Sequence, residues 1–322
     1  MKKLVSLLLA VMLMCSVAFA ADYPTKGIDV ICPWAAGGGT DACLRALCMA
    51  AEKVLGQTMT VENRTGGGGI IGHSAIQTAR PDGYTIGMIT FELSTYDALG
   101  AAEMNYNDFA LLCRVNTDAS AITVNTAWAQ ANNITDLNAF VDFVKANPGA
   151  VNVGVSAVGS VWQIGAGLFA TEAGLDYTIV PYPDGAAAAT TSVAGGHIEA
   201  VAVSLAEVRS QVDAGNLTIL GVMDNTRSSL YPDVPTFQEC GYDIEYGTWR
   251  GMAVSKDTDP EIVEILSAAF ETAVEDPDFV EFMNNAGQKI AYLNAADFEA
   301  FLAQNYADVS STLEALGLTE DA

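Results

Sequence analysis

The residues near the N-terminal end that are best placed to do chemistry are three consecutive glycines. Gly37, Gly38 and Gly39 follow an apolar run at residues 28–32, and they precede a segment with helical character. Glycines let backbone N–H groups converge on a ligand without side chains in the way, and the following helix directs the positive end of its dipole into the loop. The segment therefore predicts an anion-binding loop that requires no arginine or lysine.

The same segment also satisfies a dinucleotide-binding pattern, G-x-G-x-x-A at residues 37–42, with Glu62 near the position of the acid that binds the ribose. That pattern places its first glycine directly after the strand, whereas here residues 33–36 intervene. Asp41 would also put a carboxylate beside the pyrophosphate. A second match at residues 67–72 shows how readily glycine-rich segments satisfy the pattern. We therefore expect neither a dinucleotide nor another cofactor.

A second loop with similar chemistry occurs in the middle of the chain. A strand is predicted up to Ser156, Gly159 and Ser160 follow just before a predicted helix, and Gln163 lies three residues further on. Ser160 and Gln163 fit a capping box, and the serines and Gly159 are also placed to donate hydrogen bonds to a second anionic group. Both interpretations hold together, because a capped helix keeps free N–H groups in its first turn. No catalytic residue is expected, since Val158 replaces a glycine of the G-x-S-x-G pattern and no histidine is well placed.

The metal-binding and disulfide-forming residue types are sparse. The histidines are His73 and His197, and they are isolated in the sequence, so no metal site is expected. One of the six cysteines lies in the N-terminal apolar segment, and the other five include no C-x-x-C pair. An odd number without this spacing is typical of neither a disulfide framework nor a zinc site. We expect these thiols to be buried and free.

Alternating strands and helices must position the two loops. Strands are predicted at 27–32, 58–62 and 84–90, with helices at 41–55 and 70–79 between them, which indicates a parallel sheet with helices on both faces. After a junction near residues 116–126 the pattern restarts. It has helices at 134–146, 160–173 and 185–194 and strands at 151–156, 177–182, 198–204 and 217–223. A strand at 248–255 returns to the first unit, followed by helices at about 260–275, 277–286 and 296–316. This order predicts two doubly wound α/β lobes joined by two hinge crossings, with lobe 1 at 21–121 and 248–322 and lobe 2, inserted, at 122–247.

The N-terminal residues and the net charge limit the location and the partners. Residues 1–20 have a basic start, an apolar core and an A-x-A ending, so we expect a secretory signal cleaved after Ala20. No later stretch is long and apolar enough to span a bilayer. The chain has 14 basic and 39 acidic residues, a net charge of −25, which argues against nucleic acid and anionic lipid as partners.

Several segments together resemble a known family. YPTKGIDVICPWAAGGGTD, GQTMTVENRTGGGGIIG, PDGYT, VSAVGS, YPDVPTFQECG and GTWRGMAV follow one another as they do in the substrate-binding component of tripartite tricarboxylate transporters, the Bug-type proteins. The resemblance extends from Asp22 to about Leu316. It implies a periplasmic-binding-protein type II fold and a monomer in the periplasm that performs no catalysis. Such a protein captures a small mono-, di- or tricarboxylate and delivers it to the large and small membrane subunits of the transporter.

The resemblance also implies which residues contact the ligand. Gln163 stands where many relatives carry histidine, and Trp34 replaces the commoner phenylalanine, so the identity of the ligand does not carry over. For Gln163, ligand contact and helix capping both stay open. An exported α/β enzyme and a carboxylate sensor that use the same cleft are the alternative functions. The implied contacts are Trp34, Ala35, Ala36, Gly38, Gly39 and Asp41 in the first lobe, Ser156, Gly159, Ser160, Gln163, Asp184 and Gly185 in the second, and Ser94 at the side.

Overall fold

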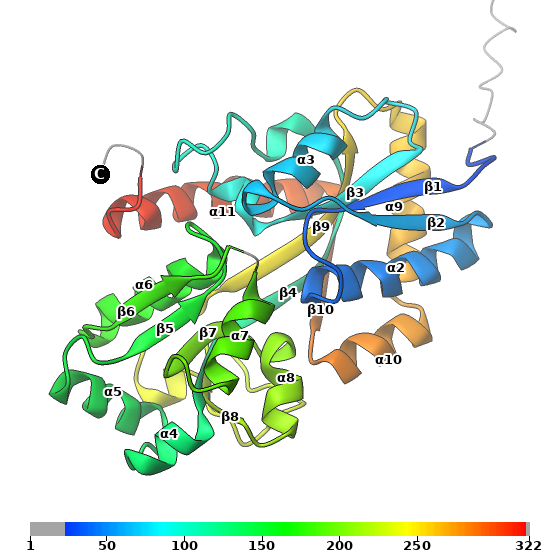
Figure 1. The fold of residues 1–322 in the computed structure, drawn as a ribbon. Helices are drawn as coiled ribbons and strands as arrows, with labels where there is room; N and C mark the ends of the chain where they lie inside the picture. Colours follow the sequence, from blue (N-terminus) through cyan, green and yellow to red (C-terminus); the bar gives the residue numbers. More distant parts are fainter. Residues whose placement is uncertain (1–22, 184, 320–322) are drawn as a thin grey trace, which may run out of the picture.

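The computed structural model describes residues 23–183 and 185–319 (Figure 1). The predicted signal segment at 1–20 and the predicted contact Asp184 lie outside the described residues. Among the described helices, none combines the length and the apolar character that crossing a membrane requires. The strands form a continuous arrangement in which two groups of elements lie at opposite ends of a pair of long strands, β4 and β9 (Figure 1).

The first group is built on β1 (Ile28–Cys32), β2 (Met59–Asn63) and β3 (Thr85–Thr90), which are parallel as predicted. β1 and β3 are short, mostly apolar runs because helices cover both faces of the sheet. On one face, α2 (Gly39–Leu55), α9 (Pro260–Ala273) and α10 (Pro277–Ala286) pack over a core that includes Leu44, Met252 and Phe270. On the other face lie α3 (Ile70–Gln77) and α11 (Ala295–Ala315).

The second group is built on three parallel strands, β5 (Asn152–Val155), β6 (Thr178–Pro181) and β7 (Ala200–Ser204), with β8 (Leu217–Val222) paired to β4. Its core includes Phe140, Phe169 and Phe237. The helices are α4 (Thr126–Ala131), α5 (Leu137–Ala146), α6 (Val161–Ala173), α7 (Ala186–Ala194) and α8 (Leu205–Asp213). Short 3-10 turns lie at η1 (Gly67–Gly69), η2 (Phe91–Ser94), η3 (Tyr106–Asp108) and η4 (Gln238–Cys240).

Most of the predicted junction at 116–126 belongs to the long strand β4 (Phe109–Asn125). β4 pairs with β9 (Gly247–Ser255) over Phe109–Ala119 and then with β7 over Ser120–Val124, so it runs through both groups. β4 and β9 are antiparallel, as are β4 and β10 (Lys289–Asn294), a strand that the sequence did not indicate. The predicted lobe boundaries at 121/122 and 247/248 fall inside β4 and at the start of β9.

The polar residues of β4 explain why its strand signal was missed. Asn116, Asp118 and Ser120 interrupt the apolar pattern, yet all three are buried, with at most 5 % of each residue exposed. They alternate along the strand and therefore share one face. Polar side chains buried at this point, where β4 passes from one group of elements to the other, are the first structural sign of a functional site.

The cysteine prediction is confirmed for Cys32, Cys43, Cys48 and Cys113, which are buried free thiols. Cys240 is also free but only half-buried.

Candidate functional site

A cavity of about 430 Å³ lies between the two groups of elements. The first group lines it with the loop before α2, and the second group lines it with the segments that begin α6, α7 and α8. The two loops singled out from the sequence thus meet at one cavity. The predicted contacts that belong to its lining are Trp34, Ala35, Ala36, Gly38, Gly39, Ser156 and Gly185.

The glycine loop turns sharply before helix α2. Gly37 has φ 81°, a left-handed conformation that glycine adopts without strain. Gly38 is the N-cap of α2 and makes no side-chain hydrogen bond to the helix. The first N–H groups of α2 therefore have no intrahelical or capping acceptor, and they lie in the segment that lines the cavity.

The predicted contact Asp41 lies behind this loop and outside the cavity lining. Its Oδ2 accepts a 2.9 Å hydrogen bond from the Gly37 N–H, and Arg45 and Asn63 donate to the same carboxylate. Burial alone would raise the pKa of Asp41, but these three donors hold it below its usual range. Asn63 also donates to the Trp34 carbonyl at 2.8 Å. Asp41 therefore holds the loop in position from outside the cavity lining.

The wall beside Trp34 is a chain of hydrogen bonds. Trp34 Nε1 donates to the Thr90 hydroxyl at 3.2 Å, and that hydroxyl donates to Glu92 Oε2 at 2.6 Å. All three residues line the cavity. The predicted side contact Ser94 does not line it, because its hydroxyl donates to Asn305 Oδ1 at 2.9 Å and the residue is 1 % exposed.

The second glycine-rich segment supports this wall from behind. Tyr96 donates to the Gly68 carbonyl and contacts His73 Nδ1, each at 2.9 Å. His73 Nε2 accepts from the Thr90 N–H at 3.2 Å, and burial lowers the pKa of His73 to about 3, so the ring is neutral. The second match to the dinucleotide pattern thus has a structural role.

In the second loop, Ser156 lines the cavity but Gly159, Ser160 and Gln163 do not. Ser160 is the N-cap of α6, and its Oγ accepts from the Gln163 N–H at 3.3 Å. Gln163 Oε1 accepts from the Gly159 N–H at 2.5 Å. These three predicted contacts are therefore engaged with one another, which is the capping interpretation. The following residues of α6, Val161 and Trp162, line the cavity in their place.

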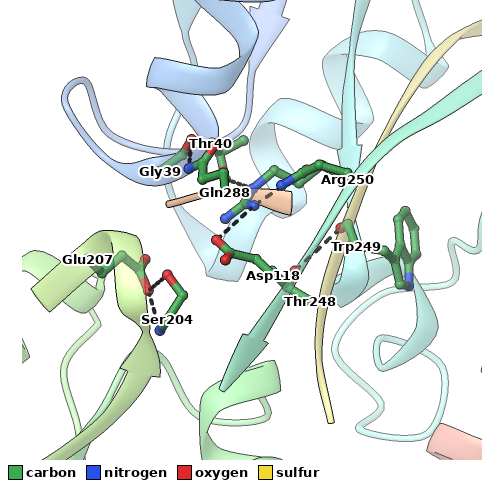
Figure 2. A network of polar contacts seen from close by, with 10 residues as sticks. Gly39, Thr40, Asp118, Ser204, Glu207, Thr248, Trp249, Arg250 and Gln288 are labelled. Carbon is green, nitrogen blue, oxygen red and sulfur yellow. Dashed lines mark hydrogen bonds and ion pairs between the residues drawn. The ribbon is translucent and has the colours of Figure 1, made fainter. Parts of the chain in front are cut away.

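The structure brings a buried arginine to the cavity, which corrects the expectation of a site without basic side chains. Arg250 on β9 lines the cavity and is 3 % exposed. Its Nε donates to the Thr40 hydroxyl at 2.9 Å, and its Nη1 lies 3.4 Å from Asp118 Oδ2 (Figure 2). A second arginine of the lining, Arg209 on α8, pairs with Asp213 at 3.5 Å.

Three carboxyl groups surround Arg250. Burial raises the pKa of Asp118 although Arg250 opposes this, and burial also raises the pKa of Glu92. Burial raises the pKa of Glu207 to about 7, again against the attraction of Arg250. Glu207 belongs to the cavity lining and forms a capping box with Ser204 at the start of α8 (Figure 2). The cavity therefore combines positive and negative groups.

Sequence reasoning missed these charged residues because four distant elements contribute them. The available signals were a charged residue inside the apolar run of β9, polar residues that alternate along β4, and the S-x-x-E spacing of Ser204 and Glu207. No group of three or more histidine, cysteine, aspartate or glutamate side chains is placed to hold a metal ion in the described part of the chain. The arrangement can hold an anion through Arg250 and free N–H groups.

The sequence is similar to those of known proteins. Residues 43–318 match the family described as tripartite tricarboxylate transporter family receptor. A UPF0065 protein from the TAR-I ttuE–ttuC' intergenic region of Agrobacterium vitis is 31 % identical over 289 residues, 88 % of this chain and 82 % of that protein. BugT of Bordetella pertussis is 30 % identical over 268 residues, 81 % of this chain and 80 % of BugT.

Solved structures of similar proteins have the same fold as this chain. A solute-binding protein of the same family from Polaromonas is 34 % identical, with a TM-score of 0.71 over 91 % of this chain and 99 % of that one. Two Rhodopseudomonas palustris proteins, one solved with adipate and the other, MatC, with bound malate, are each 22 % identical. The adipate-bound protein has a TM-score of 0.85 over 92 % of this chain and 99 % of its own. MatC has a TM-score of 0.79 over 90 % of this chain and 100 % of its own. The predicted α/β fold of periplasmic binding proteins is confirmed. The chain belongs to the family of tripartite tricarboxylate transporter receptors, which are periplasmic solute-binding proteins.

Proposed function

We propose that the protein captures a small organic carboxylate in the 430 Å³ cavity and delivers it to the large and small membrane subunits of a tripartite tricarboxylate transporter. It acts as a monomer in the periplasm after cleavage of a signal segment behind Ala20. Family membership supports the role in transport. The relatives solved with adipate and malate support a carboxylate ligand.

The observation that carries this proposal is the position of Arg250 beneath the start of α2. Nε and Nη1 of the guanidinium are engaged by Thr40, Asn116 and Asp118, whereas Nη2 has no hydrogen bond to any described residue. A Cβ atom added to Gly39 would lie 3.3 Å from Nη2, so Nη2 is next to the first turn of α2. A ligand carboxylate placed there accepts from Nη2 and from free N–H groups of the helix.

Charge-assisted hydrogen bonds of this kind are stronger than bonds between neutral groups. The helix dipole adds to the attraction, because its positive end and the guanidinium are on the same side of the ligand. The net charge of −25 does not prevent binding, because exposed acids are screened over about 8–10 Å at physiological salt. The starts of α6 and α7 provide further N–H groups from the opposite group of elements, so the ligand joins the two groups.

A ligand panel tests the proposal. Purified protein without the signal segment is titrated with acetate, succinate, malate, adipate, aspartate and citrate, and its thermal unfolding and heat of binding are measured. A bound ligand at a hundredfold excess over its Kd stabilises the folded state by about 2.7 kcal/mol. Stabilisation by at least one carboxylate, recovered chemically unchanged, is expected. No stabilisation by any of them contradicts the proposal, and turnover of the ligand would favour an enzyme.

The transport step is tested separately. Cells that express the two membrane subunits should take up the bound carboxylate when this protein is present in the periplasm and not when it is absent. Binding without this dependence would leave the binding function and remove the proposed partners.

A further inference from the structure

Two carboxyl groups line the cavity without a cation of their own. Arg250 is paired with Asp118 at 3.4 Å, and Arg209 is paired with Asp213 at 3.5 Å. Glu92 and Glu207 line the same cavity, and neither forms an ion pair with any residue in the described ranges. For a site that binds an anion this is unexpected, because uncompensated carboxylates repel the ligand in surroundings of low dielectric.

Each of these carboxyl groups uses one oxygen within the protein. Oε2 of Glu207 accepts from the N–H and the hydroxyl of Ser204, both at 3.1 Å, whereas Oε1 has no hydrogen bond to a described residue. Oε2 of Glu92 accepts from Thr90, and its Oε1 has no hydrogen bond to another residue in the part of the chain that the structure describes. Glu92 is only 7 % exposed and belongs to the cavity lining.

A third acceptor is contributed by Gln288. Its Nε2 donates to the Gly39 carbonyl at 3.0 Å, which fixes the orientation of the amide. Oε1 is then buried and has no hydrogen-bond partner among the described residues. Gln288 also belongs to the cavity lining. The lining thus contains two kinds of unpaired group. The guanidinium of Arg250 and the first N–H groups of α2 are donors that need an acceptor from the ligand. The oxygens of Glu207, Glu92 and Gln288 are acceptors that need a donor from the ligand.

A simple carboxylate satisfies only the second of these needs, because an ionised carboxylate has no proton to donate. A hydroxyl group adds one donor and no charge, whereas an ammonium group adds three donors and a positive charge. We propose, building on the carboxylate-binding function above, that the ligand is a zwitterion whose carboxylate binds at Arg250 and α2 and whose ammonium group binds Glu207 and Glu92.

The electrostatics favour this ligand over a plain diacid. Burial raises the pKa of both glutamates, which means that the protein itself does not fully compensate their charged forms. An ammonium group supplies that compensation. A second carboxylate in the same place would instead require the glutamates to take up protons, so plain diacids should bind better as the pH falls.

Two series of matched ligands test the inference by isothermal titration calorimetry at pH 7.5. Succinate, malate and aspartate carry H, OH and NH₃⁺ on the same skeleton, as do glutarate, 2-hydroxyglutarate and glutamate. In at least one series the ammonium member is expected to bind about tenfold or more tightly than both others, because hydrogen bonds to charged groups are the strong ones.

Glu207→Gln identifies the group responsible, since glutamine also fits a capping box and the start of α8 is retained. The variant should bind the ammonium member about tenfold more weakly and the plain diacid more tightly, because a like charge has been removed. Glu52→Gln is the matched control. Glu52 accepts a backbone hydrogen bond from Met59 at 2.6 Å and does not line the cavity, so both affinities should stay unchanged.

The possible failures are distinguishable. If citrate, adipate or any member without an ammonium group binds and no ammonium member binds more tightly, the inference is overturned and the carboxylate-binding function stands. The inference is overturned in the same way if Glu207→Gln leaves the preference for the ammonium member intact. If none of these carboxylates binds, the proposed function fails, and the inference fails with it.

Discussion

The Nε atom of Arg250 donates a 2.9 Å hydrogen bond to the hydroxyl of Thr40, a residue 210 positions away in the chain. This bond joins β9 to the first turn of α2 directly beneath the cavity. It holds the guanidinium at the positive end of the helix dipole, where two positive charges would repel each other without an anion between them. Asp118, 3.4 Å from Nη1, offsets part of this repulsion, and the proposed ligand offsets the rest.

Arg250→Lys should weaken carboxylate binding about 10- to 100-fold, because one ammonium group cannot maintain the bonds to Thr40 and Asp118 and also reach the ligand. Isothermal titration calorimetry with the tightest carboxylate of the panel measures the change. Arg114→Lys is the control, since Arg114 lies on β4, donates to the Ala291 carbonyl at 2.8 Å and is outside the cavity lining. An affinity for Arg250→Lys within twofold of the unmodified protein would show that Arg250 does not contact the ligand.

Gly39→Ala should lower affinity about tenfold although alanine is the better helix former. The added Cβ would lie 3.1 Å from Gln288 Nε2 and 3.3 Å from Arg250 Nη2, so it displaces both groups. Gly38→Ala is the comparison, because there the Cβ meets only the Ala35 carbonyl at 3.4 Å. Both variants are titrated with the same carboxylate. Equal affinities in the two variants would contradict a carboxylate site at Nη2.

Ser160→Ala should mainly lower the stability of the protein, whereas Ser156→Ala should mainly lower its affinity for the ligand. Ser160 caps α6 and does not line the cavity, so its loss should cost about 1 kcal/mol of unfolding free energy and little affinity. Ser156 lines the cavity, so its loss should weaken binding and leave the stability nearly unchanged. Urea unfolding and calorimetry on both variants separate the two effects. The reverse pattern would restore Ser160 as a ligand contact.

The glycine loop and Ser156 could be predicted because each follows a strand, where α/β folds place their ligands, and the family resemblance implied Trp34 and Gly185. Arg250, Asp118, Glu207 and Gln288 could not, because they come from elements far apart in the chain that meet only when the sheet forms. The spacing of residues in the sequence also could not show that Ser156 and Ser160 have different roles. One faces the cavity and the other caps a helix, and that difference lies in the orientation of the loop.

The stability of the ligand-free protein should depend on pH through Glu207. Its folded pKa is raised to about 7 from an ordinary 4.5, so the folded protein retains a proton that the unfolded chain releases. The contribution of Glu207 to the unfolding free energy should therefore fall as the pH rises from about 4.5 to 7 and level off above this range. Urea unfolding of the unmodified protein and Glu207→Gln between pH 5 and 8 measures the difference. A difference that does not vary with pH would contradict the raised pKa of Glu207 in the folded protein.

The most direct test is a crystal structure of the complex with the carboxylate that binds most tightly. We expect a carboxylate oxygen about 2.7–3.2 Å from Arg250 Nη2 and from a backbone N–H in the first turn of α2. Ligand density elsewhere, such as the 390 Å³ cavity lined by Arg227 and Lys289, would contradict the account.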